Sequence, residues 1–302
     1  MIQSSPPEEE KLASEDHLDA EGAGRGERVR RRILRSTALL PVLLTLANGL
    51  CGFASIHFAT KHAAAALGMT YLVYAAWFIV AAMVCDMLDG QVARIARRTS
   101  DFGAQLDSMC DVVSFGVAPA VLMLRTVIPS LPGQMSYVSI ERVVWGIAAA
   151  YLACAVLRLA RFNVEHESTD THFEFSGLPS PAAAGTIAAL VLLANDLSDR
   201  AWASPERLAW GLSLGLSAVA VTAALLMVSQ IRYPHLVNLY IRGRRPFNYI
   251  VRLVLVGVAA LFELYLTGAL VALLFLLSGP LRTVWKRMRT RAASTSTPRP
   301  SA

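Results

Sequence analysis

The 302-residue chain contains few charged residues. Asp, Glu, Lys and Arg make up 17% of it, whereas hydrophobic residues make up 55%. A soluble globular domain has about 25% charged and about 45–50% apolar residues. The charges are missing from particular stretches, because apolar runs of about 20 residues recur and the charges collect between them. This pattern excludes an ordinary soluble enzyme, a secreted disulfide scaffold and a basic nucleic-acid-binding domain. It indicates an all-α polytopic membrane protein.

Cysteine is also scarce. The four cysteines all lie in apolar stretches, without a CxxC pair or a partnering histidine: Cys51, Cys85, Cys110 and Cys154. We therefore expect buried thiols, and neither disulfides nor a zinc site.

Both ends of the chain are polar. Residues 1–35 are first acidic and then rich in arginine, and they lack the short apolar segment of a cleavable signal peptide. Residues 285–302 are basic and end in a Ser/Thr/Pro tail. We expect both segments to be disordered, with their arginine clusters near anionic headgroups, and a transmembrane domain over residues 36–284 between them.

About eight apolar stretches are long enough to cross the hydrocarbon core. They must be helices, since backbone polar groups in lipid have to be paired within their own segment. The stretches cover residues 38–58, 70–89, 105–126, 142–161, 180–196, 207–229, 249–266 and 267–283. The last two are nearly continuous, so either a tight hairpin or one broken helix is expected there.

Lys and Arg are distributed unevenly between the loops. With the N-terminus in the cytoplasm, 23 of the 28 basic residues fall on the cytoplasmic side and five fall on the outer side. This asymmetry predicts a multi-pass protein of the cell inner membrane with both termini in the cytoplasm. The loops at residues 90–104, 158–179 and 230–248 would face the cytoplasm as well.

Four aspartates lie where two apolar stretches meet. Asp86 and Asp89 close the second stretch, and Asp107 and Asp111 open the third. A carboxylate within a transmembrane helix costs about 3 kcal/mol or more, so it indicates a functional site. Each pair lies on one face of its helix, and the short connection makes the two helices antiparallel neighbours. The sequence therefore predicts four carboxylates together at the cytoplasmic ends of both helices.

Four neighbouring carboxylates repel one another unless a cation lies between them. Ligation by oxygen alone suits Mg²⁺, and two such ions would neutralise a diphosphate. Arg94 follows on the same face and can meet phosphate oxygens, while Gly90, Ala93 and Gly103 keep that face thin enough for a ligand. The alternative is helix capping and pairing with nearby arginines, which we prefer for Asp101 alone.

The aspartates belong to a longer pattern, Asp86-x2-Asp89-Gly90-x2-Ala93-Arg94-x8-Gly103-x3-Asp107-x3-Asp111. At every position it resembles the signature of the CDP-alcohol phosphotransferase family. The resemblance implies a catalytic six-helix membrane core, here with about two extra transmembrane helices. Such an enzyme transfers a phosphatidyl group from a CDP-linked lipid to an alcohol and releases CMP. It also implies two Mg²⁺ or Mn²⁺ ions on the four aspartates, with Asp111 as the base that takes the acceptor proton. The implied CDP-lipid contacts are Gly90, Ala93, Arg94, Ser100 and Gly103.

Further stretches resemble the branch of that family that uses L-serine as the acceptor. They are Leu40–Gly49, Arg158–Asn163, Phe175–Pro181 and Met227–Pro234. The first stretch implies that Thr45 and Asn48 lie near the nucleotide.

The cytoplasmic loop after residue 158 also makes chemical sense without the resemblance. Arg158 and Arg161 can hold the carboxylate of a small acceptor, and Asn163 its amino or hydroxyl group. Plain anchoring by the positive-inside rule explains each arginine about equally well.

Together, the resemblances imply transfer of a phosphatidyl group from CDP-diacylglycerol to L-serine. The expected partners are those two substrates and anionic membrane lipids, but no nucleic acid, and a homodimer is left open. One alternative keeps the chemistry and changes the acceptor to glycerol phosphate, inositol phosphate or choline. An intramembrane prenyltransferase would space its aspartates differently. A cation-coupled transporter would carry its charges near the bilayer midplane.

Overall fold

The computed structural model describes residues 40–61, 68–96, 101–130, 137–167, 177–200, 205–231, 233 and 247–295. Within these ranges the chain is helical and contains no strand. The expected N-terminal tail over residues 1–35 and residues 296–302 lie outside them.

The described helices follow one another along the chain in a simple order. They are a first helix over Leu40–Thr60, α2 (Gly68–Ala96), α3 (Asp101–Asp111), α4 (Ala118–Val127), α5 (Tyr137–Glu167), α6 (Ser180–Asp199), α7 (Pro205–Val228), α9 (Phe247–Phe262) and α10 (Leu264–Thr295). A π-helical segment, η1 (Val112–Val117), joins α3 to α4, so that these three form one continuous rod. A short 3-10 segment, η2 (Ile128–Ser130), ends it.

Seven of the described helical segments are long and apolar enough to cross a membrane. They are Leu40–Thr60, Tyr71–Val92, Phe102–Val127, Ser139–Val164, Ser180–Asp199, Trp210–Val228 and Leu264–Thr283. The expectation of an all-helical polytopic membrane protein is confirmed.

The C-terminal part differs from the sequence-based expectation in two respects. The eighth expected span, residues 249–266, corresponds to α9, which has 16 residues and breaks from α10 at Glu263. The expected disordered tail over residues 285–302 is instead helical as far as Thr295. Its residues up to that point include Lys, Arg, Met and Ala, which favour helix, and neither Gly nor Pro interrupts them.

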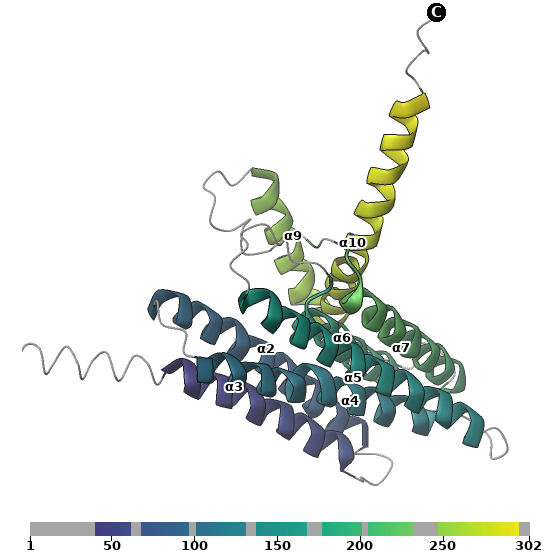
Figure 1. Cartoon of the computed structure of the whole chain (residues 1–302). Coiled ribbons are helices and arrows are strands. Elements are labelled where there is room, and N and C mark those ends of the chain that lie inside the picture. The colour runs from purple at the N-terminus through teal and green to yellow at the C-terminus, as the bar shows by residue number, and fades with distance from the viewer. Residues whose placement is uncertain are drawn as a thin grey trace, which may run out of the picture.

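The segments from α2 to α7 run side by side as one bundle, while α9 and the C-terminal part of α10 project from it (Figure 1). Helix α6 packs against α2, α7 and α10, and α5 packs against α7. Both helices bury small side chains completely, and small residues let neighbouring backbones approach closely. The fully buried alanines of α2 and α6 include Ala75, Ala76, Ala183 and Ala184.

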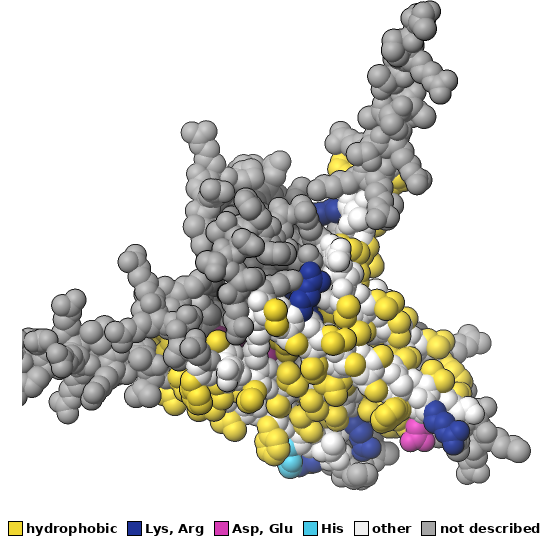
Figure 2. All heavy atoms as spheres, viewed as in Figure 1, with side chains coloured by type: hydrophobic (Ala, Val, Ile, Leu, Met, Phe, Trp, Pro, Cys, Tyr) yellow, Lys and Arg dark blue, Asp and Glu magenta, His cyan; other side chains and the backbone are white. Residues whose placement is uncertain are grey.

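The outer surface of the bundle is apolar. Large side chains such as Leu50, Phe53, Leu157 and Leu225 are more than half exposed, and hydrophobic side chains cover much of the visible face (Figure 2). A soluble monomer rarely exposes so much contiguous apolar surface, whereas a bilayer solvates it. The packing therefore agrees with a membrane-embedded bundle.

Polar contacts at the two ends of the bundle position α10. At one end, Arg200 after α6 forms a two-pronged ion pair with Glu263, with N···O distances of 2.7 and 2.6 Å. This contact lowers the pKa of Glu263. At the other end, the Tyr233 hydroxyl donates a hydrogen bond of 2.9 Å to the carbonyl of Leu276. Helix α10 thus runs from the end where α6 finishes to the end where α7 finishes.

Candidate active site

Three of the four predicted aspartates form one cluster. One carboxylate oxygen from each of Asp86, Asp89 and Asp107 lies within 4.8 Å of the other two. Asp86 and Asp89 lie in the last three turns of α2, and Asp107 lies in the following α3. The hairpin between these helices therefore brings the carboxylates together as their spacing predicts.

This cluster fits a divalent cation. Asp89 is 6% exposed, and Oδ1 of Asp107 is buried without a hydrogen-bond partner among the described residues. An unpaired buried carboxylate oxygen beside two further carboxylates is costly unless a cation compensates it. The three residues of the cluster offer carboxylate oxygens, and that is the ligand chemistry of hard divalent ions.

Asp111 completes the group but has different neighbours. It lies one turn after Asp107, is 8% exposed, and interacts electrostatically with Asp86, Asp107 and Asp89. Its Oδ1 accepts a hydrogen bond of 2.9 Å from Nδ2 of Asn48. Asp111 is therefore part of the same charged site, with one oxygen already held by an amide.

The first helix lies directly against these carboxylates. The Thr45 hydroxyl is 3.2 Å from Oδ2 of Asp89, and Thr45 and Asn48 lie one turn apart on the same face. Asn48 is completely buried, and its Oδ1 has no hydrogen-bond partner among the described residues. The structure thus brings both residues, which the sequence placed near a nucleotide, to the aspartates.

Two glycines allow the first helix to approach so closely. A Cβ atom on Gly52 would lie 2.7 Å from Cα and 2.9 Å from N of Ser114, and one on Gly49 would lie 2.8 Å from Sγ of Cys110. The Ser114 hydroxyl donates a hydrogen bond of 2.8 Å to the carbonyl of Asn48. Ser114 belongs to η1, which starts directly after Asp111, and π-helical segments often occur at functional sites.

Arg158 of α5 approaches the same site from another helix. It interacts electrostatically with Asp111 and Asp86, and its Nη1 donates a hydrogen bond of 2.6 Å to the hydroxyl of Ser180 at the start of α6. Arg161 lies one turn further along α5 and is exposed. Arg158 therefore lies within electrostatic reach of the aspartates.

Asn163 contacts the helix that carries Asp107. Its Nδ2 lies 2.9 Å from Oγ of Ser108, the residue directly after Asp107. Asn163 is exposed, as a residue at the mouth of the site should be. The contact ties the end of α5 to α3.

The remaining predicted residues are only partly described. Gly90 borders open space, since a Cβ atom there would meet no atom within 4 Å, and Gly103 lies half-buried in α3. Ala93 and Arg94 belong to α2, but their side chains lie outside the described part of the structure, and so does all of Ser100.

Several residues of the site were missed by sequence reasoning. Ser108, Ser114, Tyr151 and Ser180 hold site residues or the backbone near them; the Tyr151 hydroxyl, for example, donates to the carbonyl of Phe115 at 3.1 Å. Ser180 lies in the stretch Phe175–Pro181 that carried the family resemblance, but its contact with Arg158 was not predicted. The other three are ordinary residues of apolar helices, so no pattern marked them.

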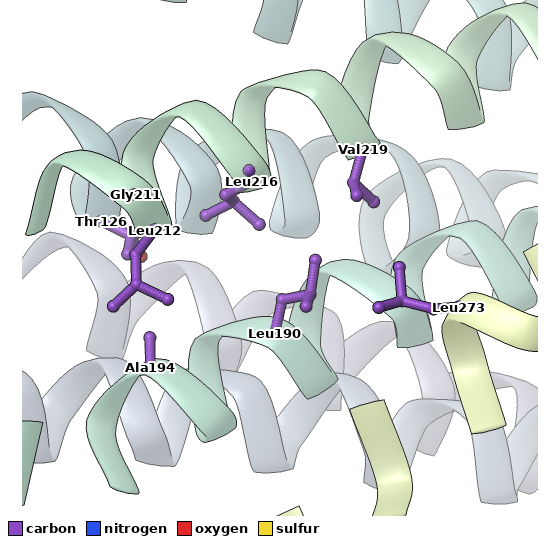
Figure 3. A pocket seen from close by; sticks show the side chains of 9 residues that line it. Thr126, Leu190, Ala194, Gly211, Leu212, Leu216, Val219 and Leu273 are labelled. Atoms are coloured by element: carbon purple, nitrogen blue, oxygen red, sulfur yellow. The ribbon is translucent and has the colours of Figure 1, made fainter. Parts of the chain in front are cut away.

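A separate cavity lies away from the aspartates. It has a volume of about 170 Å³ and lies between α4, α6, α7 and α10 (Figure 3). Leucine, valine, alanine and glycine residues line it, with Thr126 as the one polar residue. Its lining offers no group for acid–base or ionic chemistry, so the aspartate end is the candidate active site.

Known proteins match most of the chain. The family model described as CDP-alcohol phosphatidyltransferase matches residues 38–229. A CDP-diacylglycerol–serine O-phosphatidyltransferase of Helicobacter pylori (strain J99) is 34% identical over 197 residues, which are 65% of this chain and 72% of that protein. The Bacillus subtilis protein of the same name is 33% identical over 196 residues, covering 65% of this chain and 90% of its own length. The one from Methanocaldococcus jannaschii is 35% identical over 160 residues, or 53% and 63%. The matched residues include the whole site described above.

Proposed function

The chain belongs to the CDP-alcohol phosphatidyltransferase family, and from that premise we propose that it makes phosphatidylserine. It transfers the phosphatidyl group of CDP-diacylglycerol to the hydroxyl of L-serine and releases CMP. Relatives named for this reaction match 65% of the chain, and the family model spans the first helix to α7. The observation that carries the proposal is Arg158, a guanidinium close to Asp86 and Asp111. Such a group can bind the carboxylate of L-serine, which a neutral alcohol lacks.

The aspartates would hold two divalent cations, Mg²⁺ or Mn²⁺. Asp86, Asp89 and Asp107 are close enough to share one ion, and Asp111 would join the aspartates around the second. When bound, these ions supply neutralisation of the diphosphate and polarisation of the phosphorus under attack. The hairpin of α2 and α3 supplies the fixed spacing of the carboxylates.

The CDP portion would lie over the α2 side of the cluster. Gly90 leaves open space there, and the first helix presents Thr45 and Asn48 from the side. By the family pattern Ala93, Arg94, Ser100 and Gly103 would contact the same group. The acyl chains stay in the bilayer alongside the apolar outer surface.

Asp111 would be the base. Asn48 holds its Oδ1, which leaves the second oxygen to accept the proton of the L-serine hydroxyl. That hydroxyl is a weak nucleophile at neutral pH and needs such activation. Its oxygen forms a bond to the β-phosphorus while the bond from this phosphorus to the bridging oxygen breaks, and the electron pair leaves with CMP.

The acceptor would be held from the α5 side. Arg158 binds its carboxylate, with Arg161 one turn away, and Asn163 is placed for its amino group. Asn163 already contacts Ser108, so binding would exchange or share that hydrogen bond.

The aspartate end would face the cytoplasm of a cell with this protein in its inner membrane. L-Serine and the CDP headgroup of the lipid substrate are water-soluble. The positive-inside rule predicts both termini on the cytoplasmic side. Cysteine substitutions at exposed Phe102 and exposed Glu141, at opposite ends of the bundle, test this in a variant without native cysteines. A membrane-impermeant maleimide should label Phe102→Cys in inverted vesicles and Glu141→Cys in intact cells. The reverse pattern contradicts the orientation.

The decisive experiment is an acceptor panel. Purified protein with CDP-diacylglycerol should form labelled phospholipid and CMP with L-serine, and little with glycerol phosphate, inositol phosphate or choline. Product with another acceptor and none with L-serine would reassign the substrate and keep the family.

Chelation should abolish CMP release and added Mg²⁺ or Mn²⁺ should restore it, whereas full turnover in excess chelator contradicts the cation site.

A further inference from the structure

We infer that Ser180 is a positioning residue that sets the L-serine specificity of the site through Arg158. This inference rests on the proposed function, because it assumes that Arg158 binds the acceptor carboxylate. Ser180 is completely buried at the first position of α6, and its hydroxyl accepts a hydrogen bond of 2.6 Å from Nη1 of Arg158. The hydroxyl does not reach the aspartates itself.

The backbone around Ser180 is anchored independently of Arg158. Gly177 and Leu178 donate backbone hydrogen bonds of 2.9 and 3.0 Å to the carbonyls of Ile231 and Leu226 at the end of α7. Gly177 has a φ of +94°, and a Cβ atom there would clash with carbonyl oxygens at the end of α7. Only glycine therefore fits this position, and the turn is held in one conformation. The backbone of Ser180 is therefore fixed, and its hydroxyl holds the flexible side chain of Arg158 by a hydrogen bond.

Arg158 needs such a fixed point because of the charges that it faces. It interacts with both Asp86 and Asp111 across the site. A guanidinium on a long flexible stem tends to fold onto neighbouring carboxylates, where it would compete with the cations. With Nη1 bound to Ser180, the guanidinium is held at the edge of the site and its other N–H groups remain for the carboxylate of the acceptor.

The test is a comparison of apparent KM values. Ser180→Ala should raise the KM for L-serine about 10-fold or more, because a hydrogen bond to a charged group is lost. The KM for CDP-diacylglycerol should stay within about two-fold, since the variant leaves α2 and α3 untouched. Ser180→Thr keeps the hydroxyl and should restore most of the affinity. Ser213→Ala is the matched control, because Ser213 is also a buried helical serine but lies on α7.

A double-mutant cycle separates positioning from packing. In an Arg158→Ala background, Ser180→Ala should add almost nothing to the KM for L-serine, because the group that it positions is gone. If the alanine variant does not purify, Ser180→Cys keeps the volume with a much weaker acceptor and should show the same shift.

Each contrary outcome has a distinct meaning. A normal L-serine KM in Ser180→Ala, with a raised one in Arg158→Ala, overturns the positioning role and leaves the proposed function standing. Equal effects of Ser180→Ala in both backgrounds overturn it as well, because Ser180 then acts independently of Arg158. Absence of phosphatidylserine synthesis by the wild-type protein, with turnover of another acceptor, is the failure of the proposed function itself.

Discussion

Substitution of Gly52 tests whether the close approach of the first helix to η1 is needed for catalysis. Gly52 itself is not a site residue. A Cβ atom at this position would lie 2.7 Å from Cα and 2.9 Å from N of Ser114. Those are backbone atoms of η1, so no side-chain rotation relieves the clash in Gly52→Ala. Ordinary contact begins at 3.4 Å, so the first helix and η1 must separate by about 0.7 Å.

The separation acts on the two hydrogen bonds that the first helix makes to the aspartates. The bond from Asn48 to Asp111 is 2.9 Å and that from Thr45 to Asp89 is 3.2 Å. If the whole shift falls along them they lengthen to about 3.6 and 3.9 Å, beyond hydrogen-bonding distance. A misplacement of about 1 Å near the reacting groups can cost about 10²-fold. We therefore expect Gly52→Ala to lower kcat by about 10- to 100-fold.

The assay is CMP release at saturating substrates, with thermal unfolding measured in parallel. Gly146→Ala is the control, because a Cβ atom there meets nothing within 4 Å. Gly49→Ala should fall between the two, since it meets the Cys110 side chain, which can move. A Gly52→Ala protein with a wild-type kcat would refute the reasoning. The distance between the first helix and η1 would then have no effect on catalysis at Asp111.

Three other variants test separate parts of the structure. Asp111→Asn should lose about 10²–10⁴-fold in kcat while it still binds CDP-diacylglycerol, and recovery by Mg²⁺ alone would leave Asp111 a ligand and not the base. Asn48→Ala should lower kcat about 10-fold, because Asp111 loses its amide donor; an unchanged kcat contradicts this. Glu263→Gln should make α10 more sensitive to protease at neutral pH, and the difference should shrink in high salt, because the pair with Arg200 is exposed. Arg200 lowers the pKa of Glu263, so the wild-type advantage should be present above about pH 4.3, the ordinary carboxyl value, and vanish as pH falls through the lowered pKa.

The sequence predicts most of the fold because the bilayer restricts the choices. Apolar runs of membrane length have to be helices, and the expected spans up to residue 229 correspond to the first helix and α2 to α7. The C-terminal part was predicted less well. Hydropathy alone does not reveal that α9 ends before Glu263 or that Glu263 pairs with Arg200.

The site was predictable where it depends on helical spacing. Asp86, Asp89 and Asp107 meet because each lies at a regular interval on one of two adjacent helices. Contacts between distant helices carry no such periodic signal. The pairing of Arg158 with Ser180 and of Asn163 with Ser108 depends on how α5 packs against its neighbours, and only the structure shows it.

The short helix α9 has a consequence for the lipid around the protein. Its 16 residues rise about 24 Å, whereas a hydrocarbon core is about 30 Å thick. Its side chains Leu255, Leu261 and Phe262 are more than 60% exposed, so it has to be solvated by lipid. A helix of this length cannot cross the hydrocarbon core by itself, and α9 is not among the seven described segments that can. Its exposed apolar side chains therefore make α9 a segment that contacts lipid without spanning the membrane.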